Sequence, residues 1–176
     1  SSLYGWITLL KESGQENSEA FIEMEKDIER LTVVSERFSK IGSSVEIIET
    51  DLVEFFNNYI SYMKKRIPKT VELNMEFLNQ PLYALINAPL FSWVIENVIK
   101  NAADAMEGNG NIFLNIEKQQ NSIVIKVKDN GKGIPSSIQK TIFQPGYTTK
   151  DRGWGLGLSL AKRIVEGHHN GKIYIS

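Results

Sequence analysis

The chain has 176 residues, of which 41% are hydrophobic and 23% charged, so it can bury a core as one medium domain or as a small domain with an appendage. Its net charge of -1 excludes the global basic field of a nucleic-acid-binding protein, and the absence of cysteine excludes disulfides and thiol chemistry. No apolar run is long enough to span a bilayer. We therefore expect a globular, cytoplasmic chain with no nucleic-acid partner and no membrane contact of its own, and we leave membrane anchoring of a longer parent open.

Residues 1–42 are predicted to form a two-helix hairpin. Apolar side chains recur at helical spacing from Leu3 to Leu10, and the residues SGQEN that follow Glu12 indicate a turn. A second helix is expected from Ser18, its cap, to Ile41, with apolar residues at alternating three- and four-residue steps. A lone hairpin cannot bury this surface. We expect it to dimerise into a four-helix bundle, the alternative being packing on its own neighbouring domain.

From Ser43 onward, helices and strands are mixed. Strands are predicted at Val45–Ile48, Val71–Phe77, Leu82–Asn87, Asn111–Glu117, Ser122–Lys128 and from Lys172 onward. Helices are predicted from the cap Asp51 to about Arg66, over Pro89–Met106, from Pro135 for a short stretch, and over Gly155–Gly167. This order predicts an α+β chain, in which the hairpin domain 1–42 precedes an α/β sandwich, 43–176, with helices on one face of a mostly antiparallel sheet. Because the chain begins in an apolar-periodic segment and ends in a predicted strand, we expect a fragment that lacks the final strands.

The predicted helix Pro89–Met106 carries an unusual polar face. Asn97, Asn101 and Asp104 fall at i, i+4 and i+7 and therefore point the same way. Asparagine is a poor residue for the interior of a helix, because its amide competes for backbone groups. This face is a solvated surface, a set of polar groups satisfied inside the fold, or part of a site.

Three further features follow along the chain. Residues 129–134 are DNGKGI at the end of a strand, where an aspartate can accept from an exocyclic amine and glycines allow a flat ligand to approach. Residues 153–158 are GWGLGL and lead into a helix, whose free N–H groups can bind phosphate. Thr148, Thr149, Lys150 and Arg152 offer hydroxyls and cations just before it. Alone, the first is compatible with a plain turn, the second is a weak motif, and the charges are compatible with a solvated loop.

Taken together, four segments resemble a known family. NVIKNAADAM, VKDNGKGI, IFQPGYTTK and GWGLGLSLAKRIVEGHHNGKI are similar, in this order, to the N, G1, F and G2 boxes of sensor histidine kinases of two-component systems. The wider ATPase superfamily includes gyrase B subunits and mismatch-repair ATPases. The preceding hairpin looks like the dimerisation and histidine-phosphotransfer domain, which favours the kinases within this superfamily.

The resemblance implies ATP and Mg²⁺ as ligands. Asn101 would be a magnesium ligand that bridges the ATP phosphates, and Asn97 would line and share that site. In the hydrolysing relatives a glutamate general base stands at the position of Asn97, and its replacement by an amide disfavours water activation. Lys150 would contact the terminal phosphate, so Asn97 and Lys150 are the implied catalytic residues.

The remaining implied roles concern the adenine and the lid. Asp129 would bind the adenine amine in a pocket shaped by Gly131 and Gly133, and residues 143–154 would form a mobile lid anchored by Phe143. The full implied nucleotide-binding set is Asn97, Asn101, Asp129, Gly131, Gly133, Ile134, Phe143, Thr148, Thr149, Lys150, Gly153, Gly155, Leu156, Gly157 and Leu158. Asp104 belongs to the N box, but no contact is assigned to it.

The phosphoacceptor histidine of the family has no counterpart in the first predicted helix. The two histidines, His168 and His169, follow the G2 helix and are interpreted as structural. Either the first helix is cut just after its histidine, or the family member lost it. The implied function is the kinase core that transfers the γ-phosphoryl of ATP to a histidine of the dimerisation helix and then to a response-regulator receiver domain, and this chain alone is not expected to autophosphorylate. The alternative is a non-catalytic nucleotide-binding or dimerisation module, while Asn97 disfavours an ATP-hydrolysing clamp.

Overall fold

The structure is a computed structural model that describes residues 45–76, 80–150 and 154–176, together with residues 8, 11, 21–22, 24–28, 31–32 and 35. The chain divides into two compact units, residues 1–45 and 46–176. In the first unit the described residues up to residue 35 are helical, Phe21 is buried, and Lys11 pairs with Glu25 at 2.7 Å. The rest of the predicted hairpin, 1–42, lies outside the described residues, so the hairpin stays a prediction.

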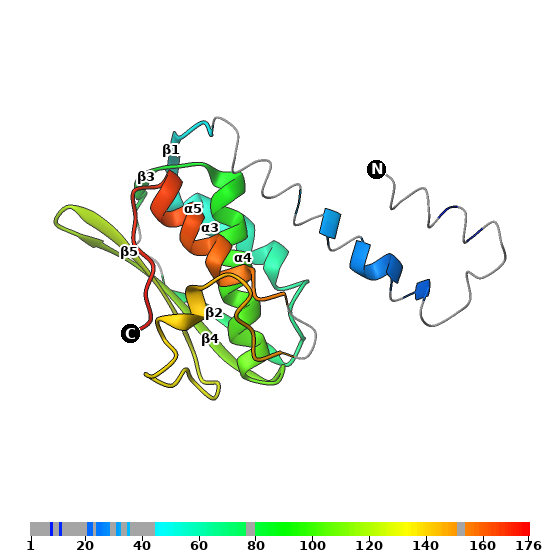
Figure 1. Cartoon of the computed structure of the whole chain (residues 1–176). Helices are drawn as coiled ribbons and strands as arrows, with labels where there is room; N and C mark the ends of the chain where they lie inside the picture. The colour runs from blue at the N-terminus through cyan, green and yellow to red at the C-terminus, as the bar shows by residue number, and fades with distance from the viewer. Residues whose placement is uncertain are drawn as a thin grey trace. The chain divides into compact units, whose positions relative to one another are not determined.

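The second unit alternates strands and helices (Figure 1). In chain order these are β1 (Ile48–Asp51), α3 (Leu52–Met63), β2 (Val71–Glu76), β3 (Tyr83–Ile86), α4 (Ala88–Ala105), β4 (Gly110–Gln119), β5 (Ser122–Asp129), the 3-10 helix η1 (Thr141–Phe143) and α5 (Gly157–His168). Among the described residues, no helix combines the length and the apolar character needed to cross a bilayer.

The strands form two sheets. In the three-stranded sheet the order is β2-β4-β5, with β2 parallel to β4 and β4 antiparallel to β5, while β1 and β3 form a separate antiparallel pair. We expected one mostly antiparallel sheet, but the larger sheet is mixed. The reason lies in the connection, because β2 and β4 are joined through β3 and α4, a crossover long enough to bring the chain back in the same direction.

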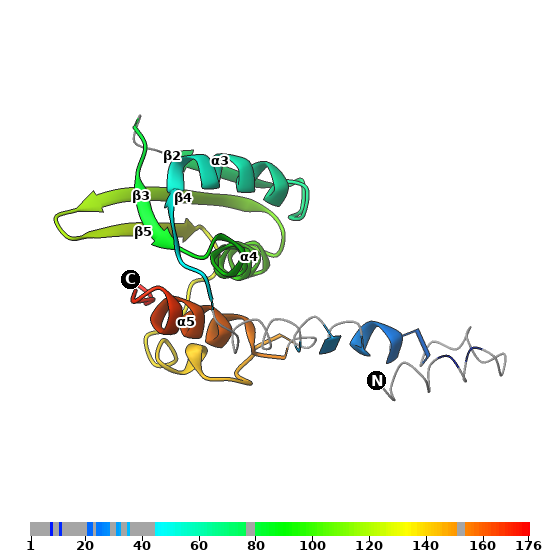
Figure 2. The same ribbon diagram turned by 90° about the horizontal axis from the view of Figure 1, so that it is seen from above.

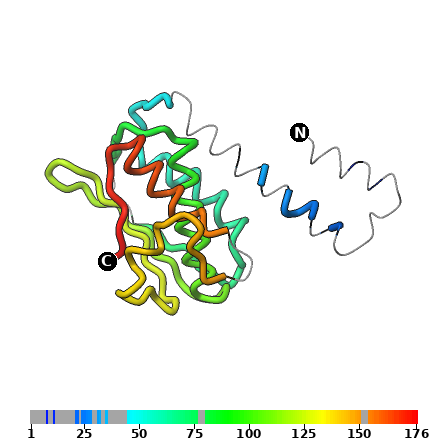
Figure 3. Tube along the Cα trace, viewed as in Figure 1, coloured from blue at the N-terminus to red at the C-terminus, as the bar shows by residue number. Residues whose placement is uncertain are grey.

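Helices cover one face of the larger sheet. Along β4, Ile112, Leu114 and Ile116 are buried, whereas Phe113 between them is 48% exposed on the other face. The buried side chains share one core with Phe56 of α3 and other apolar residues of α3 and α4. Figure 2 shows α4 between the sheet and α5, and in the trace of Figure 3 the chain after α5 runs back beside the β4–β5 hairpin. The predicted layering on one face is therefore present.

The ends of α3 and α4 are fixed by side chains that the sequence supplies. The Asp51 carboxylate accepts from Val53 N at 2.9 Å, which confirms the predicted cap of α3. The helix stops at Met63, before the Ile67-Pro68 pair, rather than at Arg66. The predicted helix over residues 89–106 is confirmed with a shift of one residue, because Asn87 caps it by accepting from Leu90 N at 2.9 Å.

Three other predictions of secondary structure differ from the fold. The first strand lies at Ile48–Asp51 rather than over 45–48, since its partner β3 pairs from Ile48 onward. After Pro135 the chain makes turns and only the short η1, because the polar residues there offer no apolar stripe to bury. Residues 171–176 form no strand, as no strand of the described residues hydrogen-bonds to them.

Candidate functional site

The polar face of α4 is partly covered. Asn97 and Asn101 are half-buried, and only Asp104 is exposed. The Asn97 amide donates from Nδ2 to Trp93 O at 2.8 Å. Its Oδ1 lies only 2.8 Å from where a Cβ on Gly157 would stand, so the first residue of α5 rests directly on Asn97. The asparagine face therefore meets another element rather than only solvent.

Lys150 of the lid also contacts this face. Its Nζ donates to Asn101 Oδ1 at 2.9 Å and to Asp104 Oδ2 at 2.5 Å. The loop around it is shaped by the Thr148 hydroxyl, which accepts from Lys150 N at 3.1 Å. We call the three-residue group of Lys150, Asn101 and Asp104 the Lys150 contact. It brings the F-box and N-box segments together across 49 residues of chain.

The aspartate loop packs on the C-terminal end of the same helix. Asp129, the last residue of β5, accepts from Gly131 N at 2.9 Å, and Lys132 N donates to Ala105 O at 3.2 Å. A Cβ on Gly131 would stand 2.8 Å from the backbone of Ala105, so this close approach needs glycine. Gly133 has a φ of +70°, a left-handed conformation that glycine adopts without strain. The predicted sharp turn is thus present, seated on the end of α4.

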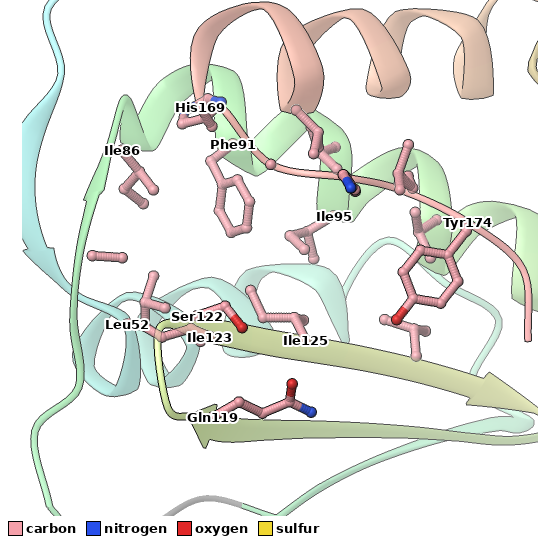
Figure 4. Close-up of a pocket in the computed structure, with 18 of the residues that line it drawn as sticks. Leu52, Ile86, Phe91, Ile95, Gln119, Ser122, Ile123, Ile125, His169 and Tyr174 are labelled. Carbon is pink, nitrogen blue, oxygen red and sulfur yellow. The ribbon is translucent and has the colours of Figure 1, made fainter.

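A cavity of about 890 Å³ opens beside these elements. The predicted site residues that line it are Asn101, Asp129, Gly133, Ile134, Phe143 and Leu158. Most of its remaining wall is apolar, and Figure 4 shows Ile123 and Ile125 of β5 on one side of it and Phe91 and Ile95 of α4 on the other. A hollow whose wall is mostly apolar and carries some polar groups is typical of a small-molecule site.

Other predicted residues lie beside the cavity rather than in its wall. These are Asn97, Gly131, Thr148, Thr149, Lys150, Gly155, Leu156 and Gly157. Gly153 lies outside the described residues. Thr148, Thr149 and Lys150 are exposed. Of these three, Lys150 reaches the cavity wall, through its hydrogen bond to Asn101.

Gly146 and Gly155, on either side of the 147–154 segment, approach each other closely. Gly146 N donates to Gly155 O at 3.0 Å, and a Cβ on Gly155, whose φ is +62°, would stand 2.4 Å from the Gly146 carbonyl carbon. Phe143 lines the cavity, and its ring lies 5.6 Å from Lys162 Nζ of α5. The chain is therefore closed into a loop by this hydrogen bond, two residues before α5 begins.

His169 connects the end of α5 to the start of α4. Its Nε2 accepts from Asn87 N at 3.0 Å, and its Nδ1 lies 2.9 Å from Ile164 O, which assigns the proton to Nδ1. Its ring meets Phe91 edge to face at 5.7 Å. Burial, above all, lowers the pKa of His169, against the hydrogen bond from Nδ1 to Ile164 O, and the neighbouring His168 lowers it further. These contacts agree with the structural interpretation of this histidine.

The contact of Asp104 was not predicted from the sequence. Its placement on the stripe of Asn97 and Asn101 was a signal, because all three face the same way. Its partner Lys150 lies 46 residues away, however, and no spacing rule links two residues so far apart.

With the geometry established, comparison with known proteins decides the family. Residues 87–176 match the family described as "Histidine kinase-, DNA gyrase B-, and HSP90-like ATPase", and this match covers more than half of the chain. The chain belongs to this ATPase family. Membership of this family supports the use of ATP, and among the chain's relatives are sensor histidine kinases.

Two relatives from Bacillus subtilis (strain 168) align over nearly the whole chain. Sporulation kinase D is 31% identical over 94% of this chain and 34% of its own length, and sensor histidine kinase YvrG is 31% identical over 100% and 33%. The chain thus spans about a third of the length of these curated relatives.

Solved structures agree with this assignment. The nucleotide-free catalytic domain of histidine kinase ThkA is 30% identical, with a TM-score of 0.68 over 74% of this chain and 86% of that one. The structure of ThkA in complex with the response regulator protein TrrA matches 98% of this chain and 52% of that one, with a TM-score of 0.71 and 22% identity, and supports the fold alone.

Proposed function

We propose that this chain is the ATP-binding kinase core of a sensor histidine kinase. It would bind ATP in the cavity beside α4 and present the γ-phosphoryl to a histidine on a dimerisation helix, from which a response-regulator receiver domain takes it. The observation that carries this proposal is the convergence of Asn101, Asp129 and Phe143, from three separate boxes, on one cavity, with Lys150 in contact with Asn101. It goes beyond the family assignment, because the family also contains ATPases without phosphotransfer.

The adenine would lie at the Asp129 end of the cavity. The second carboxylate oxygen of Asp129 has room for the exocyclic amine, since Oδ1 already accepts from Gly131 N. Ile134 and Phe143 supply apolar wall for a flat ring, and Gly133 adds none of the bulk of a side chain. Asp129 would thereby favour adenine over guanine, which presents a carbonyl oxygen at the same position.

The phosphates would lie between α4 and the start of α5. The first turn of α5 begins at Gly157 without a side-chain cap, and the backbone N–H groups of such a turn favour anions. Lys150 brings a positive charge to the same edge and would neutralise charge on the terminal phosphate. Asn97, an amide with no basic group, would orient ligands there without activating water.

A magnesium ion fits the oxygens on α4. Among the described residues, no three histidine, cysteine, aspartate or glutamate side chains form a metal cluster, so a protein-only site is not available there. Magnesium typically takes one or two protein oxygens and completes its shell with phosphates and water, and bound in this way it would neutralise charge on the phosphates. The Lys150 ammonium, 2.9 Å from Asn101 Oδ1, supports this fit because a cation already lies against that oxygen. Asn101 would be its main protein ligand and Asn97 a neighbour.

We extend the proposal to the assembly of the longer protein. The domain 1–42 would dimerise through its helical hairpin and dock the receiver domain, and the domain 43–176 would be the catalytic domain. ThkA itself has been solved in complex with the response regulator protein TrrA. The parent protein would carry the acceptor histidine.

The test is calorimetric titration of the chain with ATP, with and without magnesium. We expect Asn101→Ala to lower magnesium-dependent affinity about tenfold or more, a loss of about 1.4 kcal/mol or more in binding free energy. Asn58→Ala, which removes an exposed asparagine of α3, is the matched control and should bind like the parent. Unchanged affinity in Asn101→Ala, with an unchanged circular dichroism spectrum, would remove its metal role.

Two further measurements separate the proposed activity from its alternative. The unsubstituted chain should bind ATP more tightly than GTP, and Asp129→Asn should reduce that preference. Equal affinity of the unsubstituted chain for both nucleotides would argue against the adenine role of Asp129. The full-length parent should then take up label from γ-labelled ATP on a histidine upstream of residue 1. Binding of ATP by the full-length protein without such labelling would instead favour the non-catalytic module.

A further inference from the structure

The Lys150 contact places an ammonium on the very oxygen that the proposed metal would use. Lys150 Nζ lies 2.9 Å from Asn101 Oδ1 and is held on its other side by Asp104 Oδ2 at 2.5 Å. Asn101 and Asp104 stand three positions apart on one face of α4, so their oxygens flank a single cation. This arrangement concerns Asp104, a residue to which neither the motif nor the proposed function gives a contact.

The contact and a bound metal exclude each other. An ammonium and a divalent ion on one amide oxygen would stand only a few ångströms apart, where like charges repel strongly. The same Lys150 is also required at the terminal phosphate in the proposed function. Lys150 must therefore leave Asn101 and Asp104 when the nucleotide and its metal bind.

The ion pair between Lys150 and Asp104 is weak enough to open and close reversibly. The side chains of Lys150 and Asp104 are 43% and 56% exposed, and exposed ion pairs are weak and screened by salt. The hydrogen bond from Lys150 N to the Thr148 hydroxyl lies within residues 148–150 and does not itself hold this segment on α4. A weak, partly exposed pair can be released by a ligand that binds both of its members better.

We propose that Asp104 is a positioning residue that holds Lys150, and with it residues 146–150, on Asn101 in the nucleotide-free chain. This inference rests on the proposed function, since it takes Asn101 and Lys150 as the groups that receive metal and phosphate. Asp104 acts through Lys150. It lowers the fraction of chains that can bind nucleotide and metal, because Lys150 must first leave Asn101 and Asp104. Weakening the hold raises that fraction and tightens nucleotide binding.

The hold is measured in the absence of nucleotide by hydrogen exchange of the amides of residues 146–150. Asp104→Asn removes the charge while keeping the shape, and we expect exchange to become about two- to fivefold faster, which is the size of an exposed ion pair's contribution. Glu107→Gln is the matched control, because it removes an equal charge from an exposed residue just beyond the end of α4. In a Lys150→Met background, Asp104→Asn should add nothing further.

The second readout is the affinity for ATP in the presence of magnesium. Asp104→Asn should bind about two- to fivefold more tightly than the parent, whereas Lys150→Met should bind more weakly because it loses the phosphate contact. Unchanged exchange in Asp104→Asn, or an equal acceleration by Glu107→Gln, would overturn the hold. Weaker ATP binding in Asp104→Asn would overturn it too, by making Asp104 a part of the binding site.

These outcomes are separate from the failure of the proposed function. A parent chain that binds no ATP overturns the proposed function and the competition with metal. Faster exchange in Asp104→Asn, with no further effect in the Lys150→Met background, would still support the hold itself, because that measurement needs no nucleotide.

Discussion

His169 joins two helices that carry opposite sides of the proposed site, so its removal should destabilise the second unit. His169→Ala deletes the hydrogen bonds to Asn87 N at 3.0 Å and to Ile164 O at 2.9 Å, together with the edge contact to Phe91 at 5.7 Å. At about 1 kcal/mol for each hydrogen bond, and some loss of packing, we expect the free energy of unfolding to fall by about 2–3 kcal/mol.

Urea-induced unfolding, followed by tryptophan fluorescence, measures this loss. His169→Gln keeps an acceptor for Asn87 N and should recover about half of it. His168→Ala removes the adjacent histidine, which is given no hydrogen bond among the described residues, and should cost less than about 0.5 kcal/mol. A cost below about 0.5 kcal/mol for His169→Ala as well would refute the joining role.

The same contact predicts a dependence on pH. Burial lowers the pKa of His169 in the folded chain, whereas the unfolded chain keeps the ordinary value of about 6.5. Below that pH the unfolded chain takes up the proton first, so the free energy of unfolding falls as the pH falls from about 6.5 toward the lowered folded pKa, and it levels off below that value. The free energy of unfolding of the unsubstituted chain minus that of His169→Gln, measured from pH 7.5 to pH 5.5, should show this slope. A difference that does not change with pH would contradict the neutral state of His169.

Two further substitutions test the turns that place the site. Gly131→Ala puts a Cβ 2.8 Å from the backbone of Ala105 and should displace the aspartate loop and weaken ATP binding, whereas Gly133→Ala meets nothing within 4 Å and should cost only about 1–2 kcal/mol of left-handed strain. Calorimetry and urea unfolding separate the two, and equal effects on binding would contradict the close approach at Gly131. Asp51→Ala removes the acceptor for Val53 N at 2.9 Å and Leu82 N at 3.2 Å, and it should destabilise the chain by about 1–2 kcal/mol in urea unfolding. Asp51→Asn, which keeps an acceptor, should lose less, and an equal loss in both variants would argue against the cap.

Local patterns predicted the elements that depend on neighbours in the sequence. The helix around Asn97 follows from its apolar stripe, and the hairpin of β4 and β5 follows from alternation on both sides of a polar bend. Such patterns say which face of an element is buried. They do not say which strand lies beside it, so the parallel pairing of β2 with β4 could not be predicted from alternation alone.

The site divides in the same way. The order of the four sequence motifs predicted which residues belong to the site. The fold brings two of them, Asn101 and Asp129, to one cavity although they lie on different elements. The meeting of Lys150 with Asp104 depends on how the lid crosses α4, which no local propensity specifies. Likewise, the use of Asn87 both as the cap of α4 and as the donor to His169 requires α5 to be in place.

The hydrogen bond between Gly146 and Gly155 affects how this region should tolerate changes in loop length. Because Gly146 N bonds Gly155 O at 3.0 Å, the first residue of α5 is fixed independently of what lies between these two glycines. Lengthening such a closed loop costs only about 0.6 kcal/mol for each doubling. The segment between Gly146 and Gly155 is therefore a natural place for grafting: a longer loop, or one carrying a fluorescent label, can be exchanged there while the helices beneath keep their positions.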